Sequence, residues 1–317
     1  MTASETKEIS VQKKHSFGLV AVVISMTVLS VFFSESIKEY ARDGLLLCAR
    51  SILPTLFPFM FFSDLLVSVY DGNGKGALSF LFEKVFGLGA IAVLPFVCGA
   101  LCGFPLGAVC VGNLYRAGMF DREDAEYLVG LSSAPSLAFI ISGVGVSMLG
   151  SSALGVALFF SVIISSLITG VIFRTKERKI KISREIKRQK FDFAESVKRA
   201  GFSCVTICAF ITFFSVVTGL IGEIVKNKII LAFLTSLLEI GNASSFISSE
   251  LSASPILMLS MLGFALGFSG LSVYMQTRSV VSDIKFSGRK YLKMKLVQGV
   301  ISALIMLAFG AFWFCFL

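Results

Sequence analysis

Small polar residues, glycine and proline interrupt long apolar runs at four places in this 317-residue sequence. The interruptions centre near Gly103, Ala134, Gly241 and Ser269. Residues of these types break helices and leave backbone amides and hydroxyls without intrahelical partners. Such groups can replace the water around a bound anion. The sequence therefore indicates a binding site for a small polar ligand inside an apolar protein.

The candidate binding residues lie in these interruptions or just after them. They are Gly103, Pro105, Gly107, Ser132, Ser133, Ser136, Asn242, Ser244, Ser245, Ser269, Ser272, Gln276 and Arg278. The guanidinium of Arg278 would bind a carboxylate through two hydrogen bonds. The alternatives for Arg278 are an ion pair with Asp283 or a place at the membrane interface. Close helix packing is the alternative role of the glycines.

Two acids, Asp64 and Glu239, lie within apolar segments. Ionisable groups at such places are costly and are often functional, so both are candidates for proton coupling or for a counter-charge. An interfacial or hydrogen-bonded position is the alternative for Asp64.

The composition, with 55% hydrophobic and 15% charged residues, is that of an integral membrane protein. The single histidine, His15, lies in a polar N-terminal tail, which argues against a His-based metal site or a Ser/His catalytic pair. Most of the seven cysteines lie in apolar runs. They are expected to be small buried hydrophobes, and a metal or redox pair is the alternative. We therefore expect no cofactor, no metal and no enzymatic activity.

The elements that must position these residues are helices, some of them broken. We expect spanning helices at 16–33, 52–70, 151–173, 202–221 and 296–316, an interfacial helix at 35–50, and broken segments at 88–114, 122–149, 237–245 and 255–284. Asp121 is the expected N-cap of the segment that contains the second interruption.

Charge sets the expected orientation. Residues 174–199 hold eleven Lys or Arg against four acids, a net charge of +7, which places this loop and the N-terminus in the cytoplasm. Lys285, Arg289, Lys290, Lys293 and Lys295 are interpreted as a second basic loop on the same side. A nucleic-acid arm is the alternative for the first loop, but no motif for reading bases accompanies it, so no nucleic-acid partner is expected.

The order of segments after the first helix occurs twice. The two breaks in each copy are separated by 31 residues in the first and 28 in the second. This predicts an all-α polytopic inverted-repeat transporter with seven crossings and two re-entrant hairpins. The expected parts are a tail with the first helix at 1–36, the first repeat at 37–173, a cytoplasmic linker at 174–189 and the second repeat at 190–317. The expected partners are the lipid bilayer and a small anionic substrate, and a homo-oligomer is left open.

The stretches 103–108 (GFPLGA), 114–128 (LYRAGMFDREDAEYL), 132–150 (SSAPSLAFIISGVGVSMLG) and 267–284 (GFSGLSVYMQTRSVVSDI) resemble the YlbJ, or SpoVV, type of sporulation integral membrane protein. That type belongs to the nucleoside-recognition, or Gate, superfamily. The resemblance covers roughly residues 37–317. It implies a fold related to concentrative nucleoside carriers and transport of dipicolinic acid, pyridine-2,6-dicarboxylate, across the outer forespore membrane.

The expected function is therefore that of a permease for a small anionic metabolite in a bacterial membrane. The alternatives are a carrier for a nucleoside or another small metabolite, and a membrane assembly or signalling protein that transports nothing. An intramembrane enzyme is a further class, but it would need an activated nucleophile or a carboxylate pair, and no such motif is visible.

Overall fold

The structure, a computed structural model, describes residues 31–54, 82–88, 90–174, 192–284 and 286–316, with short pieces at 24, 27, 57–58, 60–62, 65, 76 and 79–80. Every regular element in these residues is helical. Four helical stretches there are long and apolar enough to cross a membrane: Ser152–Phe173, Phe193–Ile224, Pro255–Val280 and Gly288–Phe314. The expected all-α polytopic membrane protein is confirmed.

The first half contains one amphipathic helix, then a series of short helices, and finally one long apolar helix. They are α2 (Ser34–Leu47), its continuation η1 (Cys48–Ile52), η2 (Phe82–Phe86), η3 (Ala90–Ala92), α5 (Val93–Cys102), α6 (Leu106–Arg116), α7 (Arg122–Ser132), η4 (Phe139–Met148) and α8 (Ser152–Phe173). The predicted cap is confirmed, because Asp121 Oδ1 accepts a hydrogen bond from the Asp124 amide at 2.7 Å. The predicted helices at 16–33 and 52–70 lie largely outside the described residues, and Asp64 lies wholly outside them.

The second half contains two long helices, one at each end, and shorter helices between them. They are α9 (Phe193–Ile224), α10 (Lys228–Leu238), α11 (Ile240–Glu250), α12 (Pro255–Phe268), α13 (Gly270–Val280), η5 (Ser282–Ile284) and α14 (Gly288–Phe316). The breaks expected at 237–245 and 267–272 fall between α10 and α11 and between α12 and α13. At the second of these, Ser269 adopts a left-handed conformation with φ of 72°.

Two predicted boundaries are wrong. Helix α9 begins at Phe193 and not at 202, because the Asp192 carboxylate accepts a hydrogen bond from the Glu195 amide at 3.0 Å and caps the helix. Helix α14 begins at Gly288 and not at 296, and its first turn is closed by the Tyr291 amide, which donates to the carbonyl oxygen of Ser287. The cluster of residues 289–295 is therefore helical and is no basic loop.

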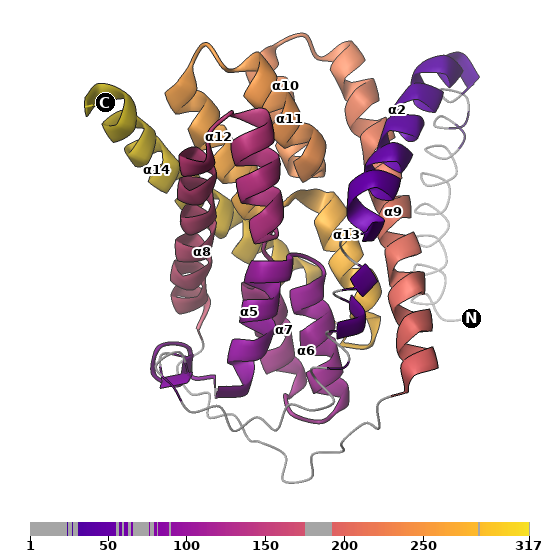
Figure 1. Ribbon diagram of the computed structural model, residues 1–317, viewed down its shortest axis with the longest axis vertical. Helices are drawn as coiled ribbons and strands as arrows, with labels where there is room; N and C mark the ends of the chain where they lie inside the picture. Colours follow the sequence, from indigo (N-terminus) through magenta and orange to yellow (C-terminus); the bar gives the residue numbers. More distant parts are fainter. Residues whose placement is uncertain are drawn as a thin grey trace, which may run out of the picture.

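The amphipathic helix α2 runs along the long helix α9 (Figure 1). The Tyr40 hydroxyl donates to Glu223, and further along α2 an added Cβ at Gly44 would lie 2.9 Å from the Thr212 Cα. The helix predicted at 35–50 is thus confirmed as a helix, and it is packed lengthwise against a candidate spanning helix.

Two pairs of short helices, α5 with α6 and α10 with α11, lie toward opposite ends of the molecule. Figure 1 shows α5, α6 and α7 at one end of the long axis and α10 and α11 at the other, with α13 between them. One buried cluster joins the breaks of both halves: it includes Ala134, Ile240 and Val273, and Phe104 packs against it. The four interruptions of the sequence therefore converge on the middle of the protein.

Candidate functional site: a buried lysine among broken helices

The two breaks of the first half fit into each other. Helices α5 and α6 form a hairpin whose tip holds Gly103, with φ of 85°, and Pro105. A Cβ added at Gly99 would lie 1.8 Å from the carbonyl oxygen of Ser132, and one at Gly103 would lie 2.6 Å from the Ser136 amide nitrogen. The hairpin glycines thus allow the backbone between α7 and η4 to pack closely against them. This is the alternative role that the sequence left open for the glycines.

Gly107 makes the same kind of contact, because an added Cβ would lie 2.3 Å from the Ser132 carbonyl oxygen. Ser136 caps the following helical segment by accepting a hydrogen bond from the Phe139 amide at 3.1 Å. The Ser133 hydroxyl donates to the carbonyl oxygen of Val129 at 2.7 Å. The Ser132 hydroxyl is buried and has no hydrogen-bond partner among the described residues.

This packing gives the first prediction. Gly99→Ala should destabilise the protein by about 1–3 kcal/mol, because the new methyl group overlaps the backbone of the facing break and neither backbone can move freely. The measurement is thermal unfolding of the purified protein in detergent. Gly222→Ala is the control, since its Cβ would meet only Leu231 Cδ2 at 3.8 Å. Equal unfolding temperatures for the two variants would show that the hairpin is not closely packed.

The two breaks of the second half also meet. A Cβ added at Gly270 would lie 2.9 Å from the carbonyl oxygen of Leu238. Glu239, only 4% exposed, caps α11 by accepting a hydrogen bond from the Asn242 amide at 2.7 Å. The Asn242 side-chain amide donates to Thr218 at 2.9 Å and to Ser215 at 3.2 Å. The polar groups of this break therefore connect it to α9.

Lys295 lies at the second break of the first half, and it is the residue that the sequence interpretation misplaced. Its side chain is 1% exposed, on the second turn of α14. The ammonium Nζ donates to the carbonyl oxygen of Ser133 at 2.6 Å and to Gln298 Oε1 at 2.7 Å. Among the described residues, no carboxylate forms an ion pair with Lys295. The Lys295 ammonium group thus faces a buried backbone carbonyl between α7 and η4.

Hydroxyl groups lie one turn before this lysine on α14 and at the break that it contacts. Tyr291, one turn earlier on α14, is 2% exposed, and its hydroxyl lies beside the Ser133 and Thr277 side chains. The Ser132 hydroxyl has no hydrogen-bond partner in the described part of the chain, whereas the Tyr291 hydroxyl has those of Ser133 and Thr277 beside it. Buried hydroxyls without partners are uncommon in folded proteins, so Ser132 indicates a place for a ligand or for water.

Polar side chains continue from Lys295 along α14. Gln298 Nε2 donates to the carbonyl oxygen of Val162 at 3.3 Å, and the Ser302 and Ser161 hydroxyls lie 3.1 Å apart. Tyr291, Lys295, Gln298 and Ser302 are spaced by four, three and four residues and share one helix face. This polar stripe in the sequence is the signal that could have identified Lys295.

The remaining predicted site residues lie in different surroundings. Gln276 and Ser272 are buried and bonded to each other, with Gln276 Nε2 donating at 3.0 Å. The Ser269 hydroxyl donates to the carbonyl oxygen of Leu266 at 3.1 Å. Ser244 is buried and its hydroxyl has no partner among the described residues, whereas Ser245 is exposed.

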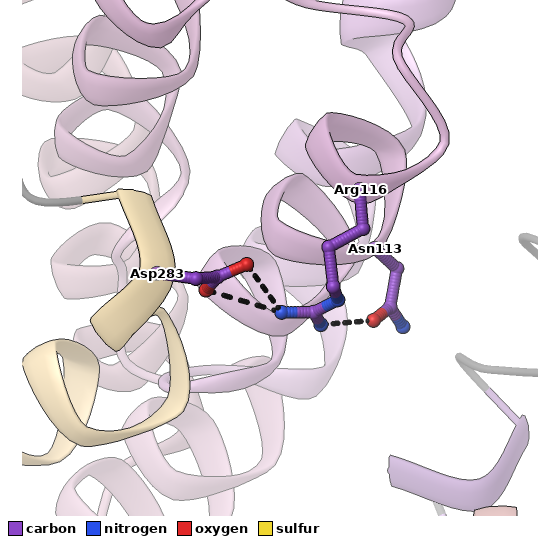
Figure 2. Close-up of polar contacts among 3 residues, drawn as sticks. All are labelled: Asn113, Arg116 and Asp283. Carbon is purple, nitrogen blue, oxygen red and sulfur yellow. Dashed lines mark hydrogen bonds and ion pairs between the residues drawn. The ribbon is translucent and has the colours of Figure 1, made fainter.

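Arg278 is exposed and donates a hydrogen bond to the Tyr274 hydroxyl at 3.2 Å. The alternative pairing of Arg278 with Asp283 does not occur, because Asp283 pairs with Arg116. Figure 2 shows Arg116 between Asp283 and Asn113, with Nη1 at 3.1 Å from Asp283 Oδ2. Sequence reasoning missed Arg116, which lies just after the broken segment predicted at 88–114.

The buried cysteines form no metal centre in the described residues, where no group of three or more His, Cys, Asp or Glu could hold an ion. The described cysteines Cys48, Cys98, Cys102, Cys110, Cys204 and Cys208 are free thiols.

The fold and the site define a polytopic, all-α membrane protein in which broken helices enclose a buried lysine. The chain is 22% identical to the sporulation integral membrane protein YlbJ of Bacillus subtilis (strain 168), over 94% of its own length and 83% of the relative. This similarity supports a YlbJ-type family for the chain. No family model matches the chain, and no solved structure matches it.

Proposed function

We propose that this protein is a membrane permease that moves a small anionic metabolite, with pyridine-2,6-dicarboxylate as the first candidate. The observation that carries the proposal is Lys295, a buried cation without a carboxylate partner among the described residues, placed where two helix breaks meet. A charge at membrane depth is costly unless it is paired, and such residues commonly mark substrate pathways. An anionic substrate would supply the missing partner.

The donors around Lys295 suit a carboxylate. An ammonium group has three N–H donors, and the hydrogen bonds to Ser133 and Gln298 use two of them. The third N–H has no acceptor in the described residues, and the Tyr291 hydroxyl, one turn earlier on α14, lies beside those of Ser133 and Thr277. A bound carboxylate would accept hydrogen bonds from these groups. They would take the place of the water molecules that hydrate it in solution.

The arrangement of the helices supports a carrier with two halves of opposite orientation. Each half has a pair of short helices joined at a break and a second broken helix that contacts it, and the two pairs lie at opposite ends of the molecule (Figure 1). Inverted repeats with broken helices at the midplane are a common transporter design. We propose that the Gate-like repeats at 37–173 and 190–317 are such halves, with two re-entrant hairpins and with 174–199 in the cytoplasm.

The relative is a sporulation protein, and we propose a role in sporulation for this chain too. Placement in the outer forespore membrane and movement of pyridine-2,6-dicarboxylate toward the spore follow from the resemblance of the sequence motifs. Movement of a nucleoside is the alternative within the same fold.

The test is uptake of labelled pyridine-2,6-dicarboxylate by proteoliposomes that contain the purified protein, with excess uridine in a parallel sample. We expect saturable uptake that uridine does not reduce. Vesicles without protein are the control for leakage. Uptake that uridine blocks would favour the nucleoside alternative, and no uptake by folded protein would contradict the proposed substrate.

A further inference from the structure

A second polar site lies where helices of both halves meet. A cavity of about 490 Å³ that opens to the surface is lined by α6, α9 and α13, with Asn113 and Arg116 from α6, Lys198 and Arg199 from α9 and Ser279 from α13 among its residues. Three cationic side chains line it against a single carboxylate, that of Glu195. The cavity is therefore electropositive, and it is large enough for a small aromatic dianion.

The cations are held in different ways. Arg116 is fixed by Asp283 on one side and by Asn113 on the other, as Figure 2 shows. Arg199 lies 4.0 Å from Glu195 on the next turn of the same helix, an exposed ion pair that contributes little. Lys198 has no ion-pair partner among the described residues. The lining thus keeps positive charge that its own acids do not neutralise.

Two helix faces lead from this cavity to the breaks. Val109, Asn113 and Arg116 line it from one face of α6, and the same face continues four residues back from Val109 to Pro105 at the hairpin tip. On α13, Ser279 follows buried Gln276 by three residues, and the Ser279 hydroxyl donates to the Gln276 carbonyl oxygen at 2.8 Å. The cavity and the breaks therefore lie at opposite ends of the same two helices, α6 and α13.

We propose that this cavity is an anion-binding vestibule in which Lys198, Arg199 and Arg116 bind a small dicarboxylate before it moves to Lys295. The inference rests on the proposed function for the class of ligand. Positive charge lining a cleft concentrates anions there and raises their rate of association, and this effect weakens as salt screens it.

The experiment measures equilibrium binding of labelled pyridine-2,6-dicarboxylate to the purified full chain in detergent, at low salt. A Lys295→Gln background removes the central charge, so that remaining binding reports the vestibule. We expect saturable binding in that background, and Lys198→Gln with Arg199→Gln should weaken it at least tenfold. The matched control is Arg289→Gln with Lys293→Gln, which removes the same charges from exposed positions of α14 outside the cavity.

The inference is overturned if the Lys295→Gln protein shows no saturable binding, or if the control pair weakens binding as much as the cavity pair. Wild-type uptake is measured separately in proteoliposomes. Uptake without vestibule binding contradicts this inference alone, whereas vestibule binding without uptake contradicts the proposed function alone.

Discussion

Lys295→Gln is expected to lower the initial rate of pyridine-2,6-dicarboxylate uptake by about 100-fold or more. The substrate's carboxylate would then enter a buried site without its cationic partner, and an uncompensated buried charge costs about 3–5 kcal/mol. About 1.4 kcal/mol corresponds to a factor of ten. Glutamine retains N–H donors for the Ser133 carbonyl oxygen, so the link between α14 and the break is preserved. The measurement is uptake by proteoliposomes with equal amounts of folded protein.

The matched control is Lys293→Gln, because Lys293 is exposed two residues earlier on the same helix. Its uptake should stay within about twofold of wild type, since surface charges contribute little. Thermal unfolding of the Lys295→Gln protein should be unchanged or slightly higher, because removing a buried charge without a carboxylate partner relieves a desolvation cost. Full uptake by Lys295→Gln would show that Lys295 only ties α14 to the break.

The breaks could be predicted from the sequence because their causes are local. Proline lacks an amide donor and glycine adopts positive φ, so the tip at Gly103 and Pro105 follows from residue type alone. The start of α12 at Pro255 and the cap at Asp121 have equally local causes. Such features need no knowledge of the neighbouring helices.

The pairing of the breaks could not be predicted in this way. That Gly99 receives the Ser132 carbonyl and that Gly270 receives the Leu238 carbonyl depends on how distant helices pack. Close helix packing was the alternative role predicted for the glycines, and the structure shows which backbone atoms they approach. A glycine in the sequence shows that another segment of the backbone can pack closely at that position. It does not show which segment does so.

Lys295 was assigned to a basic loop because it follows four other cations within eleven residues. A count of charges treats all these cations as equal, whereas in a helix each side chain points in its own direction. Lys293 points to the surface and Lys295 to the interior, only two positions apart. Lys295 can be recognised as the buried cation only from its helix face, which also carries the buried polar residues Tyr291 and Gln298.

A comparable limit applies to Arg278. Its place after a break suggested that it binds a carboxylate, but the side chain is exposed. The polar residues that face inward from α13 include Ser272, Gln276 and Thr277. The buried cation of the candidate site, Lys295, comes instead from α14. Sequence spacing alone does not show which cation faces the interior.

Glu239→Gln is expected to abolish the stimulation of uptake by an imposed pH gradient while uptake down a substrate gradient continues. Glu239 is the buried acid among the described break residues, and a carboxylate at this depth can carry a proton across when its surroundings change. Glutamine keeps a side-chain oxygen that can accept the hydrogen bond from the Asn242 amide. The measurement compares uptake with and without a pH gradient in the same vesicles.

Glu239→Ala separates this role from capping. Alanine removes the acceptor for the Asn242 amide and should destabilise the protein by about 1–2 kcal/mol, visible as a lower temperature of thermal unfolding. If Glu239→Gln responds to the pH gradient as wild type does, while Glu239→Ala unfolds earlier, the carboxylate is only the cap of α11. A coupling proton would then have to bind elsewhere, and the positive charge of Lys295 would act on the substrate alone.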